Sequence, residues 1–372
     1  MYNSRHAAGK EIQMHDGRTG AESAVVSAFG RKKKNRHMAA AAALAVFFCA
    51  CGRPLPEPPD RIQAGVAYYN QRDTFLSELN DCLKEQLYKL ENKHFEVTVT
   101  TKDAAGLQRT QDDQVKELID AGCNVLCVNL ADRSDPSEII DLAREHQVPI
   151  IFFNREPVAE DLMQWEGLFY VGADAQQSGV MQGELAAKAI QADSQIDRNK
   201  DGKIQYVVLE GEPGHQDAII RTESAVDTLK KNGIELEKLS CGIANWNRAQ
   251  AQNRMMQIIS EHQNRIELVL ANNDDMALGA IDAYQKMNYT ETALPVFFGI
   301  DGTDAGLEAV AESKLAATVY NDKEGQAAAM AKLAAALVLK KGLEETGLVD
   351  GKYIYLPYEK VTRDNVSSFT GA

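Results

Sequence analysis

A polar stretch at residues 196–205, IDRNKDGKIQ, has the spacing of oxygen ligands found in calcium-binding loops. Asp197, Asn199 and Asp201 occupy alternate positions, and Gly202 follows at the sixth position, where such a loop turns sharply. The twelfth position, which ordinarily holds a bidentate glutamate, is Val208 inside the apolar run YVVL. The pattern therefore predicts either a calcium site whose last ligand lies elsewhere in the chain, or only a polar turn before a strand.

A second group of polar residues follows seven apolar runs, in the segments AYYNQRDTF, CVNLADR, FFNREP, EGEPGHQDA, ANNDD, GIDGTD and VYNDKE. Asn supplies a donor and an acceptor, Asp two acceptors, and Arg a fork of donors, so planar groups of this kind can satisfy two neighbouring hydroxyls of a sugar. Asn and Asp also cap helices, which is explanation enough for any single segment. Seven such segments in succession favour a cleft lined with hydrogen-bonding groups.

Two aromatic residues lie beside polar residues in segments expected to be loops. Phe75 occurs in RDTFL and Trp246 in ANWNRA. One ring from each of two domains could sandwich the apolar faces of a pyranose, although each ring taken alone is as readily explained as ordinary core.

The apolar runs that carry these polar ends alternate with helical patterns. Runs such as IQAGVAYY, FEVTVTT, NVLCVNL and VPIIFFN alternate with amphipathic segments such as TFLSELNDCLKEQLYKL. Continuous apolar strands between helices predict parallel sheets covered on both faces. Nine such runs exceed one comfortable sheet, so an α/β fold of two doubly wound lobes is expected, with ligands bound beyond the carboxyl ends of the strands.

The charge and the N-terminus restrict the function further. The chain has 372 residues and a net charge of −14, and without residues 1–51 it would carry 32 basic and 51 acidic residues. An acidic body of this kind argues against a nucleic-acid partner. Residues 1–51 contain a basic cluster, an apolar run and small residues, which is typical of a secretion signal, and the first 30 residues could be an over-extended start.

The end of this signal, FCAC, resembles a relaxed bacterial lipoprotein box with Cys51 as the acylated residue. Cys49 fits less well because Phe48 precedes it, and cleavage without lipidation is the alternative. Residues 52–60, GRPLPEPPD, are rich in proline and predict an extended linker. The expected location is the periplasm, with a lipid anchor in a bacterial membrane.

Long motifs in the body of the chain resemble one family. The segments VPIIFFNREP, NKDGKIQYVVLEGEPGHQDA, IELVLANNDDMALGA and TVYND are similar to those of the bacterial galactose/glucose-binding proteins of ABC transport, which are class I periplasmic binding proteins, and the resemblance runs from about Ile62 to the C-terminus. It implies binding of D-glucose or D-galactose, Tyr69 at the cleft edge, and a set of sugar ligands: Asp73, Phe75, Asn129, His215, Asp217, Arg221, Trp246, Asn273, Asp301 and Asn321.

The same resemblance implies how the loop at 197–205 is completed. The family places a calcium site here with a distant glutamate, which corresponds to Glu267, so the implied ligands are Asp197, Asn199, Asp201, the carbonyl of Lys203, Gln205 and Glu267. Lys203 replaces the neutral residue expected at its position, although only its backbone oxygen is needed.

The resemblance further implies three chain crossings between the lobes, with residues 61–148 and 321–357 in the N-terminal lobe and residues 149–320 and 358–372 in the C-terminal lobe. Sugar binding would close the hinge between them. The implied partners are the membrane subunits of an ABC transporter and a chemoreceptor, with the protein itself expected to be a monomer.

Three other functions fit parts of the pattern. A glycosidase could use Asp73, Asp217 or Asp301 as a carboxylate pair, but neutral Asn groups and Arg221 beside the acids suit binding better than an acid of raised pKa. A transcriptional repressor of this fold would need a helix-turn-helix where the signal lies. A binding protein for a pentose or an autoinducer is the third, and the contexts of Trp246 and Asp301 favour a hexose over either. The sequence does not choose between glucose and galactose.

Overall fold

The fold consists of two six-stranded sheets, each covered by helices on both faces. The computed structural model describes residues 60–92 and 95–370. The signal with Cys51, and all of the linker except Asp60, lie outside this range. Among the described residues, no helix is both long enough and apolar enough to cross a bilayer.

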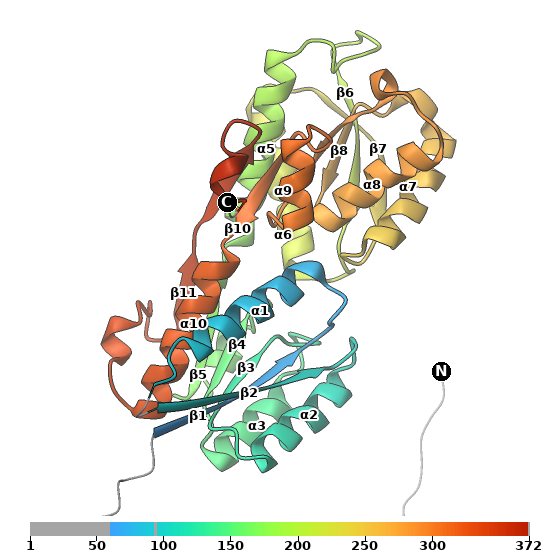
Figure 1. Ribbon diagram of the computed structural model, residues 1–372. Coiled ribbons are helices and arrows are strands. Elements are labelled where there is room, and N and C mark those ends of the chain that lie inside the picture. Colours follow the sequence, from blue (N-terminus) through green and yellow to red (C-terminus); the bar gives the residue numbers. More distant parts are fainter. Residues whose placement is uncertain (1–59, 93–94, 371–372) are drawn as a thin grey trace, which may run out of the picture. The chain divides into compact units, whose positions relative to one another are not determined.

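The first sheet has the order β11-β5-β4-β3-β1-β2, and all of its strands run parallel. Helices α1 and α10 pack together on one face and α2 and α3 on the other (Figure 1). The elements of this lobe are β1 (Asp60–Tyr68), α1 (Thr74–Tyr88), β2 (Phe95–Asp103), α2 (Gln108–Asp120), β3 (Val125–Val128), α3 (Ser137–His146), β4 (Ile150–Phe153), α4 (Ala159–Leu162), β5 (Leu168–Ala173), α10 (Lys323–Leu339) and β11 (Tyr353–Leu356).

The second sheet repeats this arrangement with the order β12-β10-β9-β8-β6-β7. Only β12 runs antiparallel to its neighbour, β10. The elements are α5 (Ala175–Ala192), β6 (Ile204–Glu210), α6 (Gln216–Lys231), β7 (Leu236–Ile243), α7 (Arg248–His262), β8 (Leu268–Ala271), α8 (Asp274–Lys286), β9 (Val296–Phe298), α9 (Asp304–Ala311), β10 (Ala317–Asn321) and β12 (Tyr358–Thr362).

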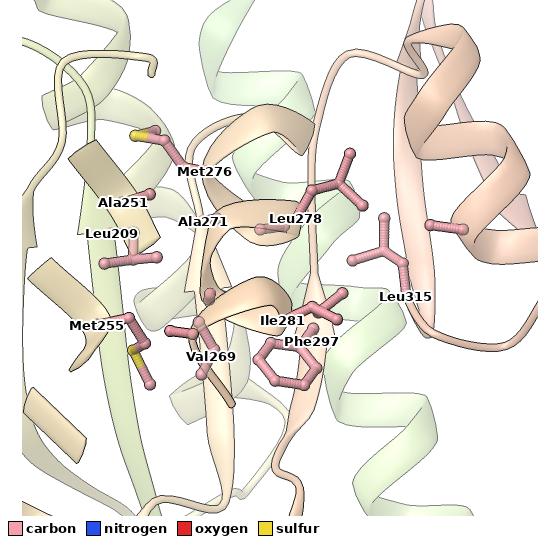
Figure 2. Packing of buried hydrophobic residues seen from close by; sticks show 14 of the residues in the cluster. Leu209, Ala251, Met255, Val269, Ala271, Met276, Leu278, Ile281, Phe297 and Leu315 are labelled. Carbon is pink, nitrogen blue, oxygen red and sulfur yellow. The ribbon is translucent and has the colours of Figure 1, made fainter. Parts of the chain in front are cut away.

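Each face of each sheet has its own apolar core. Figure 2 shows the core between the second sheet and α7 and α8, where Met255 and Ile281 from the helices meet Val269 and Phe297 from the strands. The opposite face of this sheet packs against α5 and α6. A sheet buried on both faces needs apolar side chains at successive positions, which explains why β3, β4 and β8 are buried along their whole length.

The predicted α/β fold of two doubly wound lobes is confirmed, but the lobe boundary at 148–149 is wrong. Strand β4 pairs with β3, and β5 pairs with β4 and β11, so the chain leaves the first sheet only after Ala173. An apolar run identifies a buried strand but contains no information on which sheet the strand joins.

Three strands were not among the predicted runs. Strands β7, β11 and β12 lie at the edges of their sheets and carry exposed residues such as Lys238, Tyr355 and Glu359. An edge strand needs fewer apolar positions than a central one, so the signal of a continuous apolar run is missing there.

Candidate functional site

A pocket lies where the two sheets direct the carboxyl ends of their strands. The lining residues are Tyr69, Asp73, Phe75, Asn154, Arg155, His215, Asp217, Arg221, Trp246, Asn273 and Asp301. The position follows from the topology, because in each sheet the strand order reverses beside β1 or β6, where neighbouring loops separate and leave a crevice.

Several lining residues also cap helices. Asp73 is the N-cap of α1 and accepts the amide of Leu76 at 3.0 Å, and Asn273 is the N-cap of α8 and accepts the amide of Met276 at 2.9 Å. The helix uses one oxygen of each residue, while Asp73 Oδ2 also accepts the Tyr69 hydroxyl at 3.3 Å and Asn273 Nδ2 donates to Trp246 O at 3.3 Å. Capping and pocket lining are therefore not alternatives for these two residues.

His215 is held in one tautomer. It is the N-cap of α6, and its Nδ1 accepts the amide of Asp217 at 3.2 Å. Burial, together with the charges of Arg155 and Arg221, lowers the pKa of His215 well below its ordinary value. A neutral imidazole whose Nδ1 accepts must carry its proton on Nε2, so the pocket receives a hydrogen-bond donor there.

The carboxylates of the pocket have few internal partners. Asp301 is paired only with Arg221, whose Nη1 lies 3.5 Å from Oδ1, and the Asp217 carboxylate accepts no hydrogen bond from the described residues. Burial raises the pKa of Asp73 to about 6, and it also raises the pKa of Asp217 and of Asp301. These groups can accept hydrogen bonds from a ligand that the protein itself does not supply.

Two arginines fix the polar wall. Arg221 donates to Asn272 O at 2.8 Å and to the Tyr358 hydroxyl at 3.0 Å. Arg155 lies over the Tyr69 ring, with its Cζ 3.6 Å from the ring centroid, and donates to Glu212 at 2.7 Å. In both arginines Nε is buried and has no hydrogen-bond partner. Each guanidinium therefore retains one donor that a bound polar molecule could satisfy.

Trp246 and Phe75 line the same pocket and at the same time belong to the apolar cores of their lobes. The Trp246 ring meets the His215 ring edge to face, with centroids 5.0 Å apart. A Cβ at Gly211 would lie 2.1 Å from the indole, so only glycine lets the backbone approach the ring this closely. Each ring therefore belongs to its apolar core and also lines the pocket, so the core role does not exclude the predicted contact with a ligand.

Three residues that line the pocket have a positive φ angle. Asn154, Trp246 and Asp301 have φ angles of 59°, 60° and 114°, which residues other than glycine seldom adopt. Asp301 is held by two backbone hydrogen bonds to β10, from its own amide to Val319 O and from the Asn321 amide to its carbonyl. Strain of this kind persists only where the surrounding structure fixes it, and it is typical of binding sites.

Eight of the ten predicted sugar ligands line the pocket, while Asn129 and Asn321 lie behind its wall. Asn129 is fully buried, accepts the Tyr69 amide and donates to Phe153 O. Asn321 accepts from Gln326 at 2.7 Å. In this structure the Asn129 side chain holds strand ends, the Asn321 side chain contacts helix α10, and neither residue lines the pocket.

The pocket also contains residues to which the sequence assigned no role. Asn154 and Arg155 lie in the quoted motif VPIIFFNREP, directly after β4. Asp274 is buried behind the pocket and accepts the amide of Thr303 and the hydroxyl of Thr318, which fixes the loop that follows Asp301. The polar end of the β4 run was the available signal for Asn154 and Arg155.

The loop of residues 197–205 connects α5 to β6, and Glu267 lies beside it at the start of β8. The Glu267 carboxylate is buried and accepts the amides of Arg198 at 2.7 Å and Gln205 at 3.1 Å. Asp201 accepts from the amide of Lys203 and from the side chain of Gln205. The five side chains predicted to bind a metal therefore lie together. The backbone of Lys203 lies beside them, since its amide donates to Asp201.

Metal binding at this loop can be tested against its hydrogen bonds. Asp197 Oδ1 is buried and has no hydrogen-bond partner, as expected for a ligand oxygen. Among the described residues, no three His, Cys, Asp or Glu side chains form a metal-binding group by themselves, so an ion here would need amide and carbonyl oxygens in addition to the carboxylates. The Asn199 amide nitrogen donates to Asp201 and Gln205, and this amide would have to turn for its oxygen to bind a cation.

Comparison with known proteins agrees with the fold and the position of the pocket. Residues 64–342 match the model of the periplasmic binding protein domain. The chain belongs to this family. Its relatives include the D-galactose/methyl-galactoside binding periplasmic protein MglB of Haemophilus influenzae, which is 34% identical over 82% of this chain and 91% of its own length.

Two further relatives of this periplasmic binding protein are named for, or were solved with, other ligands. The putative rhizopine-binding protein of Rhizobium meliloti is 30% identical over 84% of this chain and 93% of its own length. An ABC transporter solute binding protein from Bacillus halodurans, solved with myo-inositol, is 28% identical with a TM-score of 0.70, covering 85% of this chain and 99% of that chain. The family is thus common to all three, while the named ligands differ.

Proposed function

We propose that this periplasmic binding protein captures a hexose, D-glucose or D-galactose, reversibly and without chemical turnover, and delivers it to an ABC transporter. The observation that carries the proposal is a pocket in which the Asp217 carboxylate, to which no described residue donates, meets Arg155 and Arg221, each with an unpartnered Nε, and two aromatic rings. A pyranose presents hydroxyls that both donate and accept, together with apolar C–H faces, so it can satisfy each of these groups. The galactose-binding relative supports the choice of a hexose.

Calorimetry with purified protein tests this proposal. The panel contains D-glucose, D-galactose, ribose, xylitol and myo-inositol, and one hexose is expected to bind with a stoichiometry of one and the highest affinity. Failure of both hexoses to bind would contradict the proposal. Tight binding of myo-inositol alone would favour a cyclitol-binding protein, the second candidate, which the solved relative with that ligand supports.

A glycosidase is the proposal's competitor from another class. Its general acid would need a raised pKa, and burial does raise the pKa values of Asp73, Asp217 and Asp301. The same acids, however, lie beside Arg221 and Arg155, which suits the binding of a ground state. Incubation with nitrophenyl glycosides is expected to release no nitrophenol, and steady release that is lost in Asp217→Asn would identify an enzyme.

We also propose that Ca²⁺ binds the 197–205 loop through Asp197, Asn199, Asp201, the Lys203 carbonyl, Gln205 and Glu267. Three carboxylates would supply the negative charge, and oxygen ligands alone favour Ca²⁺ over softer metals. The unpartnered Asp197 Oδ1 and the buried Glu267 support the proposal. The ion would connect the loop to the start of β8, so its contribution is to stability.

Lipid attachment at Cys51 is the last part of the proposal, with the body held outside the cytoplasmic membrane. Two acyl chains hold a protein stably at a bilayer, whereas one chain holds it only weakly. Mass spectrometry of the native protein is expected to find a diacyl or triacyl group on Cys51 as the first residue. An unmodified Cys51, or an N-terminus beyond it, would contradict the anchor.

Signalling through a chemoreceptor would use the sugar-bound form and is tested by pull-down with and without hexose.

A further inference from the structure

Side chains of the two lobes bond to one another outside the pocket, along helix α1 of the first lobe. Thr74, the first residue of α1, donates its hydroxyl to the Asp275 carboxylate in the first turn of α8 at 2.6 Å. Glu78, one turn further along α1, accepts the amide of Asp304, the first residue of α9, at 3.2 Å. Because α8 and α9 belong to the second lobe, these bonds exist only where the lobes are in contact.

Lys323 completes this contact from the first turn of α10. Its side chain is buried, although the helix dipole disfavours a positive charge at the N-terminus of a helix. The ammonium donates to Glu78 of its own lobe at 2.6 Å and to Asp304 of the second lobe at 2.8 Å. Glu78 and Lys323 are therefore a pair within the first lobe, and closure of the lobes adds the amide and the carboxylate of Asp304 to this pair.

These five residues, which we name the interlobe latch, do not line the pocket: Thr74, Glu78, Asp275, Asp304 and Lys323. Three of them nevertheless lie within three residues of a predicted sugar ligand that does line it. The pairs are Asp73 with Thr74, Asn273 with Asp275, and Asp301 with Asp304. Asp73 and Asn273 cap α1 and α8, so the helix N-termini that position pocket side chains also position the latch.

We propose that the interlobe latch sets how tightly and for how long the pocket holds its ligand, although the latch residues do not line that pocket. This inference rests on the proposed capture of a hexose. The apparent affinity of a site is reduced by the fraction of the protein that is in the binding-competent arrangement, so each bond that favours contact between the lobes raises the affinity. A ligand enclosed between two lobes leaves only after they separate, so loss of a latch bond is expected to act on the dissociation rate.

Another bond between the lobes, from Arg155 to Glu212, lies at the pocket itself. Arg155 lines the pocket, so a change there would alter ligand contact and lobe contact together. The latch separates the two effects, because its side chains can be changed without changing a residue of the pocket wall.

Calorimetry and stopped-flow measurement of hexose release from the purified full-length protein test the latch. The probe is D-glucose or D-galactose, whichever binds the parent more tightly. Thr74→Val keeps the branched shape of the side chain and removes the hydroxyl that donates to Asp275. One hydrogen bond contributes on the order of two- to tenfold to an equilibrium constant, so Thr74→Val is expected to weaken binding by about that factor through faster dissociation. The association rate is expected to stay close to that of the parent, and the matched variant Thr74→Ser, which keeps the hydroxyl, is expected to bind as the parent does.

Asp304→Ala tests the second bond of the latch. The Asp304 side chain is 83% exposed, and an ion pair of this kind contributes little, so a loss of affinity of less than about fivefold is expected. The two changes act on the same contact between the lobes, and their effects on the dissociation rate are expected to multiply in the combined variant. Exposed Asp227→Ala is the matched control and is expected to change nothing. The Tm of each sugar-free variant is expected to equal that of the parent.

Two results would overturn the latch and leave the hexose function standing. The first is hexose release from the combined variant at the rate of the parent. The second is a lower Tm of the sugar-free variants with no change in release, which would assign these residues to the stability of the fold alone. If only myo-inositol binds the parent, the hexose function is overturned, and the same variants test the latch with that ligand. Absence of binding by the hexoses and by myo-inositol would overturn the hexose function and the latch together.

Discussion

The pocket and the 197–205 loop contain the same kinds of carboxylate and amide groups, but the protein supplies more donors to Glu267 and Asp201 than to Asp301 and Asp217. In the loop, Glu267 accepts backbone amides with both of its oxygens and Asp201 accepts amide donors on both of its own. In the pocket, Asp301 has one long contact with Arg221, and none of the described residues donates to the Asp217 carboxylate. A network satisfied by its own backbone stabilises the fold, whereas buried carboxylates without donors cost stability until a ligand supplies them.

The electrostatics follow the same division. The backbone hydrogen bond from Lys203, which is the largest favourable cause, lowers the pKa of Asp201, whereas burial raises the pKa of each pocket carboxylate. Changes in the pocket are therefore expected to alter binding with little effect on the loop, and changes in the loop are expected to alter stability with little effect on binding. The four predictions that follow test this separation.

The largest expected effect is that of Asp301→Ala on hexose affinity. A charge-assisted hydrogen bond contributes about 1.5–3 kcal/mol, so its loss is expected to weaken binding by roughly ten- to a hundredfold. Calorimetry measures the affinity, and exposed Asp364→Ala is the matched control. Unchanged affinity in Asp301→Ala would show that this carboxylate does not bind the sugar.

Removal of calcium is expected to have the second largest effect. An ion that binds only the folded state stabilises it by about 2.7 kcal/mol at a concentration one hundred times its Kd, so a chelator is expected to lower the Tm while hexose affinity changes little. Glu267→Gln is expected to lose most of this sensitivity, and exposed Glu261→Gln is expected to keep it. A Tm that does not respond to chelator, or full sensitivity in Glu267→Gln, would show that the loop is only a turn.

The third prediction concerns pH and Asp73. Because its pKa is raised to about 6 in the folded protein, its ionised fraction falls as the pH falls from 7 to 5. If the ionised form accepts the sugar hydroxyls, hexose affinity is expected to fall about tenfold over this interval through Asp73 alone. A folded pKa above the unfolded value means that the folded state binds the additional proton, so the sugar-free protein is expected to gain stability over the same fall in pH.

Asp73→Asn separates these two effects. Asparagine caps helices as well as aspartate does, so α1 keeps its N-cap while the titrating group is removed. The variant is expected to lose part of the pH dependence of both affinity and Tm between pH 5 and 7. If affinity and Tm of Asp73→Asn depend on pH as they do in the parent, the pH dependence would belong to Asp217 or Asp301 instead.

The smallest expected effect is that of Trp246→Phe. Phenylalanine keeps an aromatic ring at this position, so affinity is expected to fall by less than tenfold. An aromatic contact contributes about 0.5–1.5 kcal/mol beyond its buried area. The sugar-induced change in tryptophan fluorescence is expected to disappear. Trp165→Phe, which removes the other tryptophan, is expected to keep it. A change that survives Trp246→Phe undiminished would place the sugar away from this ring.

The sequence predicted the members of the pocket better than their arrangement. Asp73, His215 and Asn273 follow strand runs and precede helices, and a polar residue at that position both caps the helix and lies at the carboxyl edge of the sheet. Asn129 also follows a strand run, yet its amide is used to hold the neighbouring strand ends. The identity of a residue does not determine which of its possible partners lies closest, so Asn129 and Asp73 could not be told apart from the sequence.

The sequence by itself determined the two-lobed α/β architecture, because continuous apolar runs between amphipathic helices can be buried only in sheets covered on both faces. It also determined the spacing of oxygen atoms at 197–201, which is local in the chain. The tertiary structure decided that β4 and β5 belong to the first sheet and that Arg155 reaches Glu212. Each of these depends on contacts between residues distant in the chain, which are fixed by packing and not by any local pattern.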